Sequence, residues 1–293
     1  MSVRNQNIMP QTLSQERKQP PFGSVKGRIR SFVPKAVLLF VRLFRTGDGK
    51  KMWSFLIGKD SGLSFRERLV LVYRFNYISR KVECQHLESE ILAFACEVFK
   101  LPATVGGCLV EAGCFKGGGT AKLSIVATLS HRELVVCDSF EGIPENREDH
   151  GTTLFGGGAL FRAGDYRGDL EEVKGNVRDY GEIRVCRFVK GYFEDTLTDF
   201  RDSVAAAYID ADLASSTRTC LKYLWPLLAP GGVIFSQDGH LPLVLDVLRD
   251  KAFWQSELGC GPPEVIGLGL KKLVWFRKLV TIDAACRRAG VIA

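Results

Sequence analysis

The sequence predicts an α/β protein with a doubly wound, mainly parallel sheet. Short apolar runs of strand length alternate with segments of helical periodicity over residues 108–278. Apolar strands separated by helices are typical of a parallel sheet with helices on both faces. The 293 residues, 46% of them hydrophobic, are enough for one large α/β domain with an N-terminal appendage.

The N-terminal 82 residues differ from the rest in composition and charge. Residues 1–27 are polar and lack periodicity, so we expect a disordered basic tail. Residues 28–82 are expected to form a helical extension. Residues 1–51 contain eleven Lys or Arg and two acidic residues, which leaves the remainder of the chain close to neutral. Because no basic face is then indicated on the folded domain, a nucleic-acid partner is not expected.

Residues 30–45 (RSFVPKAVLLFVRLFR) place apolar side chains on one helical face and Lys35 and Arg42 on another. The run is too short and too charged to span a bilayer. One interpretation is a helix packed on the core or on a partner subunit of a homo-oligomer. The other is a helix lying on an anionic membrane surface.

The pattern of cysteines indicates the kind of cellular compartment in which the protein works. Nine are scattered singly and no Cys-x-x-Cys pair occurs, so neither a zinc ribbon nor a redox pair is indicated. Free cysteines of this kind fit a reducing compartment. The expected location is therefore the cytoplasm, with membrane association through residues 30–45 as an alternative.

Residues 83–280 carry the alternating pattern of the predicted domain, and residues 281–293 are expected to be a C-terminal tail. An amphipathic helix over 83–99 precedes the first strand. Strands are expected over 108–112, 133–138, 183–189, 205–210, 232–237 and 271–278. Helices are expected over 118–129, 214–228 and 242–251.

One segment inside the domain lacks any steady period. It covers residues 145–170 (ENREDHGTTLFGGGALFRAGDYRGDL) and is rich in Gly, Arg and Asp. A loop of this length inside a compact domain is usually a lid or a binding loop. A disordered surface insertion is the alternative interpretation.

A glycine-rich turn, VEAGCFKGGGTAKLS (110–124), follows the first predicted strand. A P-loop is excluded, because Lys116 precedes the glycine cluster instead of following it. Glu111, Gly113 and Gly117 form the pattern Glu-x-Gly-x-x-x-Gly, which is wider than the dinucleotide pattern and suits a ligand without a pyrophosphate. An amino-acid carboxylate near the start of the following helix would meet unpaired N–H groups. A tight turn with no ligand is the alternative.

Asp138 ends the second strand, 19 residues after Gly119. An acid at this position accepts hydrogen bonds from both hydroxyls of a ribose. Both NAD and S-adenosylmethionine carry that diol, so Asp138 indicates an adenosine ligand without deciding between them. A turn or helix-capping Asp is the alternative.

Four stretches of the sequence, the first of them the glycine-rich turn, together carry a resemblance to a known family. VEAGCFKGGGTAKLS, VCDSFEGIPE, VKGYFEDTL and YIDADLASSTRTCLKYLWPLLAPGGVIFSQDG occur in the order and spacing of the macrocin O-methyltransferase family, which the chain resembles over about residues 83–255. The resemblance implies a Rossmann-like class I methyltransferase fold. It also implies transfer of a methyl group from S-adenosylmethionine to a sugar hydroxyl, typically with magnesium.

The resemblance implies roles for residues at the ends of the first three strands. Glu111 and Gly113, with Gly117, would line the methionine half of the cofactor. Asp138 would hold the ribose. The residues that would lie beside the adenine are Ser139, Phe140, Gly191, Tyr192, Phe193 and Glu194; Glu194 has a plain alternative as a helix-start acid.

At the ends of the fourth and fifth strands, Asp210 and Asp238 would bind magnesium, which prefers oxygen ligands. The acceptor hydroxyl must also lose a proton, and Asp210 or His240 is the expected base. The chain departs from the family at two positions. Gln237 stands where the family commonly has the first of two aspartates, so an amide would be the ligand there, and Ala214 stands where it has a tyrosine.

The sequence therefore predicts an S-adenosylmethionine-dependent O-methyltransferase that acts on a hydroxyl of a sugar, glycoside or related natural product. Two alternatives remain at this stage. One is a methyltransferase fold that binds its ligand without turnover, which the changes at Gln237 and Ala214 keep open. The other is an NAD-dependent oxidoreductase, against which the order of the glycines argues.

Overall fold

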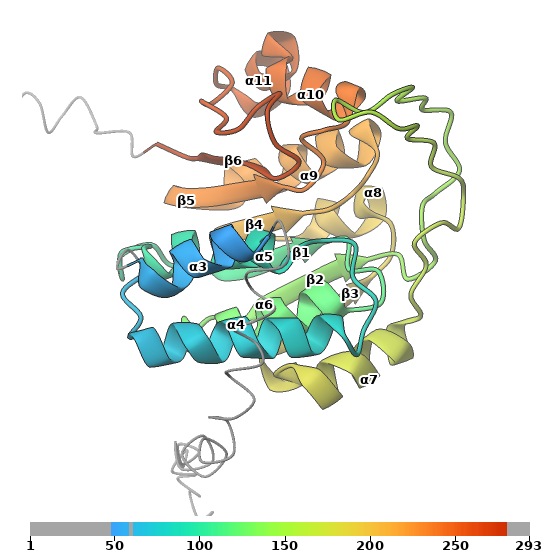
Figure 1. The fold of residues 1–293 in the computed structure, drawn as a ribbon. Helices are drawn as coiled ribbons and strands as arrows, with labels where there is room; N and C mark the ends of the chain where they lie inside the picture. The colour runs from blue at the N-terminus through green and yellow to red at the C-terminus, as the bar shows by residue number, and fades with distance from the viewer. Residues whose placement is uncertain (1–47, 59–60, 280–293) are drawn as a thin grey trace, which may run out of the picture. The chain divides into compact units, whose positions relative to one another are not determined.

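Six strands form one sheet in the order β3-β2-β1-β4-β5-β6 (Figure 1). In the computed structural model, residues 48–58 and 61–279 are described. The strands are β1 (Cys108–Ala112), β2 (Leu134–Asp138), β3 (Cys186–Lys190), β4 (Val204–Ile209), β5 (Leu228–Ser236) and β6 (Val274–Arg277). The first five are parallel and β6 runs antiparallel to β5. The predicted doubly wound, mainly parallel sheet is confirmed.

Helices cover both faces of the sheet. On one face, α5 (Glu88–Phe99) contacts β4 and β5 and packs on α6 (Gly118–Leu129), which in turn contacts α7 (Leu170–Tyr180). On the other face, α9 (Ala214–Leu227) packs on β4 and contacts α8 (Phe193–Thr196), α10 (Pro242–Arg249) and α11 (Lys251–Leu258). Short 3₁₀ turns cover Ile183–Val185 and Leu197–Asp199.

The helical extension is confirmed over the part that the structure describes. It contains α3 (Gly49–Ile57) and α4 (Phe65–Ser79), which pack on each other and on α5. A capping box starts α4: Ser64 accepts from the Glu67 N–H and the Glu67 carboxylate accepts from the Ser64 N–H. The predicted tail over 1–27, the amphipathic run over 30–45 and the C-terminal tail over 281–293 lie outside the described residues.

Two predicted boundaries differ from the structure because of side-chain caps. The helix expected from residue 83 begins at Glu88, where the Glu90 carboxylate accepts the N–H of Leu87 at 2.8 Å. The helix expected over 242–251 ends at Arg249, because Asp250 leaves the helical conformation; Asp250 then caps α11, which was not predicted, by accepting from the Phe253 N–H at 3.1 Å. In neither case did the apolar period reveal the break.

The core lies against both faces of the central strands. All residues of β1 and β4 are buried, as expected for strands covered by helices on both sides. Between the sheet and α9–α11, Trp225 and Trp254 meet edge to face with ring centroids 5.0 Å apart, and Phe276 of β6 packs against both. Among the residues described, none of the helices has the length and apolar character that crossing a bilayer requires.

Candidate functional site

A cavity of about 290 Å³ opens at the carboxyl ends of the parallel strands, the edge at which doubly wound folds bind ligands. Most of the residues predicted from the sequence line it. They are Glu111, Gly113, Asp138, Ser139, Tyr192, Phe193, Glu194, Asp210, Asp238 and His240. The structure does not place Gly117, Phe140, Gly191 or Gln237 on the cavity wall.

The end of β1 comes very close to the end of β4. Gly113 has a φ of +89°, and a Cβ at this position would lie 2.0 Å from the carbonyl oxygen of Asp210. The two strand ends are tied together, since the Asp210 N–H donates to the Ala112 carbonyl at 2.8 Å. Only glycine satisfies both the backbone conformation and the contact, so the turn after β1 is built around Gly113.

Glu111 carries a buried carboxylate that is incompletely hydrogen-bonded. Its side chain is 2% exposed, and Oε2 has no hydrogen-bond partner among the described residues. Burial, with a smaller contribution from the nearby carboxylates of Asp138 and Asp210, raises the pKa of Glu111 to about 8. A cationic group of a ligand placed beside Glu111 would relieve this penalty, so the residue fits the ammonium end of an amino acid.

Asp138 holds two turns in place. Its Oδ2 accepts from the Cys114 N–H and its Oδ1 from the Phe140 N–H, both at 2.7 Å. Phe140 adopts a left-handed φ of +57° as a result and its side chain is buried away from the cavity. Burial raises the pKa of Asp138, and these backbone N–H groups oppose the rise. Each carboxylate oxygen keeps a second lone pair for a ligand hydroxyl.

Gly117 has a packing role in this structure. It is the residue before α6 and has a φ of +80°. A Cβ there would lie 2.9 Å from Cγ1 of Val173, so the glycine lets α7 pack on the start of α6. Its predicted place in the cofactor site is therefore indirect, through the position of the helix N-terminus.

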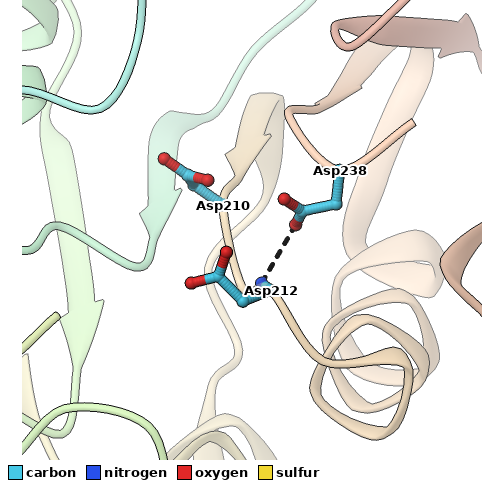
Figure 2. A group of neighbouring side chains, drawn as sticks. All are labelled: Asp210, Asp212 and Asp238. Carbon is cyan, nitrogen blue, oxygen red and sulfur yellow. Dashed lines mark hydrogen bonds between the residues drawn. The ribbon is translucent and has the colours of Figure 1, made fainter. Parts of the chain in front are cut away.

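Three carboxylates gather at the ends of β4 and β5 (Figure 2). Asp210, Asp212 and Asp238 each offer an oxygen, and these atoms lie within 4.8 Å of one another. Oδ2 of Asp238 accepts from the backbone N–H groups of Ala211 at 3.0 Å and Asp212 at 3.1 Å. These bonds hold Asp212 at a φ of +59°, an uncommon conformation for a non-glycine residue and one that often marks a functional site.

The carboxylate cluster is short of positive charge. Burial raises the pKa of Asp210, Asp212 and Asp238, and Asp238 raises those of the other two. Lys272, which also lines the cavity, works in the opposite direction on all three. Three carboxylates at this separation, one buried and two half-buried, are poorly ionised together without a further cation. Their oxygen donors fit a divalent ion such as Mg²⁺.

The sequence predicted only part of this cluster. Asp210 and Asp238 were expected as metal ligands, whereas Asp212 was missed. The signal was present as Asp-Ala-Asp at the end of β4. The side chain of Asp212 joins the cluster only because its backbone turns left-handed, and spacing alone does not predict that turn.

Gln237 does not join the carboxylates, so the predicted metal role does not fit the structure. Its side chain is fully buried; Oε1 accepts from the Tyr208 hydroxyl at 2.7 Å and Nε2 donates to Oε2 of Glu90 at 2.8 Å. An amide can donate on one side and accept on the other, which an aspartate at this position would not do. Gln237 thus links α5 to β4 behind the cavity.

His240 stands at the mouth of the cavity. Its Nδ1 has no hydrogen-bond partner within the described part of the chain, and its ring stacks on Phe155 with centroids 6.3 Å apart. Burial, with smaller contributions from Lys272 and His150, lowers the pKa of His240 to about 4. The imidazole is therefore neutral near pH 7. It can accept a hydrogen bond but is a weak base.

The segment predicted as a lid covers one side of the cavity. Residues 145–169 contain no helix or strand beyond one bridge between Thr152 and Gly158. Glu148 anchors the segment by accepting from the N–H groups of Ala214 at 2.6 Å and Ser215 at 2.9 Å, the first residues of α9. Six of its residues line the cavity: Thr153, Gly158, Ala159, Leu160, Phe161 and Tyr166.

Comparisons with known proteins agree with this architecture. The chain is 31% identical over 178 residues to 8-demethyl-8-(2,3-dimethoxy-alpha-L-rhamnosyl)-tetracenomycin-C 4'-O-methyltransferase of Streptomyces olivaceus, covering 57% of this chain and 65% of that protein. It is 35% identical over 140 residues to demethyldecarbamoylnovobiocin O-methyltransferase of Streptomyces niveus, covering 46% of this chain and 53% of that protein. The matched regions thus span less than two thirds of either relative.

A solved structure supports the fold. The crystal structure of CalS11, a calicheamicin methyltransferase, superposes with a TM-score of 0.52 at 16% identity, covering 79% of this chain and 93% of that one. The family described as Macrocin-O-methyltransferase (TylF) matches residues 95–250, a range that contains β1 to β5 and every carboxylate of the cavity named above. The chain belongs to the macrocin O-methyltransferase family.

Proposed function

We propose that the protein transfers a methyl group from S-adenosylmethionine to a hydroxyl of a sugar carried by a small natural product. The observation that carries the proposal is one cavity in which Glu111, Asp138 and the cluster of Asp210, Asp212 and Asp238 face the same space. Family membership and the sugar-bearing products in the names of the two relatives support the substrate class.

The cofactor would lie along the ends of β1 to β3. Glu111 would bind the ammonium of its methionine part, beside Gly113, which also lines the cavity. Asp138 would accept from the ribose hydroxyls. Tyr192 and Glu194, which line the cavity beyond β3, would lie beside the adenine.

The cluster of Asp210, Asp212 and Asp238 would hold a divalent cation. Such an ion, when bound, lowers the pKa of an alcohol and stabilises the alkoxide that forms as the proton leaves. The chain itself contributes orientation: Asp238 fixes the turn that carries Asp212, so the carboxylates are set before any ligand arrives. Orientation of the acceptor oxygen behind the methyl group supplies much of the rate enhancement.

Proton removal is the remaining chemical task. Asp210 is the stronger candidate for the base, because its carboxylate lines the cavity beside the place where the cation and the acceptor hydroxyl would meet. His240, kept neutral by burial, would accept a hydrogen bond from the sugar and help to orient it. The lid segment and its aromatic Phe155, stacked on His240, would enclose the acceptor and keep water out.

Two measurements test the proposal. Calorimetry should detect binding of S-adenosylhomocysteine, the product form of the cofactor, and Asp138→Ala should weaken it strongly. Asp199→Ala, at a carboxylate whose side chain is 93% exposed, is the matched control and should bind as the parent does. Transfer of labelled methyl to members of a glycoside panel should then follow. Binding without transfer to any sugar-bearing acceptor would argue for a non-catalytic binding protein instead.

A further inference from the structure

The segment just before α5 forms a wall of the cavity that the sequence did not point to. Cys84 and His86 line the cavity and lie against the first turn of α6. A Cβ on Gly118 would lie 2.2 Å from Sγ of Cys84. A Cβ on Gly119 would lie 2.8 Å from Oε1 of Glu111 and 3.1 Å from Cε1 of His86. Glu111 and His86 therefore both lie close to Gly119 in the first turn of the helix.

Behind His86 lies a fully buried lysine. Lys122 of α6 has no exposed surface, and its ammonium donates to Oγ of Ser79 at 2.7 Å, Nε2 of His86 at 3.2 Å and Sγ of Cys84 at 3.7 Å. An ammonium has three protons, and here it meets three acceptors. None of these partners is a carboxylate. The cluster thus carries a buried positive charge that no carboxylate pairs with directly.

This arrangement fixes the tautomer of His86. A lysine ammonium has no lone pair, so Nε2 of His86 must be the acceptor in their contact, and the proton of the neutral ring is on Nδ1. Burial lowers the pKa of His86 well below its usual value, with Lys122 and then Lys272 adding to the effect, so the ring is neutral. Nδ1 lies 3.8 Å from the position of a Cβ on Gly119, which Oε1 of Glu111 also approaches.

We propose that the Nδ1–H of His86 binds the carboxylate of the cofactor's amino-acid part, with Lys122 as the positioning residue that holds the imidazole. The inference rests on the proposed function. Glu111 would take the ammonium on the other side of Gly119, so the pair recognises a zwitterion. The positive end of the α6 dipole and the buried Lys122 charge both favour an anion at this point, and Gly117 before α6 offers no capping side chain of its own.

The test is a ligand series measured by calorimetry. S-adenosylhomocysteine has both the carboxylate and the amine, its decarboxylated analogue lacks the carboxylate, and methylthioadenosine lacks both. In the parent, we expect the decarboxylated analogue to bind about 10- to 100-fold more weakly than S-adenosylhomocysteine, as for loss of a hydrogen bond to a charged group. His86→Gln should remove most of that preference while it leaves methylthioadenosine binding within about twofold.

Two matched variants separate recognition from structure. The Gln side chain can present its carbonyl where Nε2 was, which keeps an acceptor for Lys122, but it offers no donor at the Nδ1 position. His86→Asn does the reverse and should retain more of the preference for the carboxylate. Lys122→Met should lower S-adenosylhomocysteine affinity selectively, whereas a purely structural role would weaken all three ligands together. Thermal unfolding confirms that each variant is folded before binding is compared.

The outcomes are distinguishable. If the parent binds S-adenosylhomocysteine and methylthioadenosine but His86→Gln leaves the carboxylate preference unchanged, the role of His86 is wrong and the proposed function stands. Equal weakening of all three ligands in His86→Gln also overturns it. If the parent binds no adenosyl ligand at all, the proposed function fails and this inference fails with it.

Discussion

Glu111→Gln is expected to change the stability of the ligand-free protein in a way that depends on pH. Burial raises the pKa of Glu111 to about 8 from an ordinary value near 4.5. The folded state thus binds this proton more tightly than the unfolded chain, so the contribution of Glu111 to stability falls as the pH rises from 4.5 to 8. At about 1.4 kcal/mol per pKa unit, the loss reaches roughly 5 kcal/mol at alkaline pH.

The amide in Glu111→Gln cannot ionise, so the variant escapes this loss. It leaves a buried amide donor without a partner, which costs about 1–3 kcal/mol at every pH. The variant should therefore be less stable than the parent at pH 5 and more stable, by about 2 kcal/mol, at pH 8.5. Urea unfolding of the chelated proteins at both pH values measures the difference, with Glu172→Gln at an exposed position as the control.

The same variant should bind S-adenosylhomocysteine far more weakly, because it loses the carboxylate that pairs with the ammonium. Gain of stability with loss of binding would identify Glu111 as a group kept for function at a cost to the fold. A stability difference between Glu111→Gln and the parent that is the same at pH 5 and pH 8.5 would refute the reasoning. It would mean that Glu111 is solvated or already paired in the free protein.

The remaining predictions concern the turn after β1, the polar chain behind the cavity and the carboxylate cluster. Gly113→Ala should reduce the free energy of unfolding, measured in urea, by more than about 3 kcal/mol, because its Cβ would lie 2.0 Å from the Asp210 carbonyl oxygen. Gly175→Ala is the control: no atom lies close to its Cβ position, so the substitution should be neutral or stabilising. Gln237→Asp places a second carboxylate near Glu90, so it should lower the free energy of unfolding by about 2–3 kcal/mol near pH 7 and by less at pH 4. An equal loss of stability at both pH values would exclude charge repulsion as the cause. Asp212→Asn should weaken Mn²⁺ binding at least about tenfold in calorimetry, and unchanged affinity would place the ion elsewhere.

The strands and helices could be predicted from the sequence where glycines clearly separate one apolar run from the next. The strand over 108–112 and the helix over 118–129 have the predicted bounds, because glycines separate a buried strand from a helix. The helix α11 was not predicted; it begins directly after α10, separated only by Asp250, which caps it. Local sequence patterns do not show where a single polar side chain replaces a helical hydrogen bond.

The site was predicted where a strand end brings a functional side chain to the cavity by itself. Asp138 and Asp210 were found in this way. Residues whose role depends on contacts distant in the sequence were not found. Gln237 has its partner Glu90 147 residues away, and His86 contacts Lys122, which is 36 residues further along the chain. Spacing in one sequence carries no signal for such pairs.

A crystal structure of the protein with S-adenosylhomocysteine and Mg²⁺ would show whether one cavity holds both the cofactor and the ion. We expect the amino group of the ligand within hydrogen-bond distance of Glu111, its ribose hydroxyls at Asp138, and the ion between Asp210, Asp212 and Asp238 in the same cavity. A ligand bound away from the ends of β1 and β2, or an ion held by other residues, would contradict this expectation.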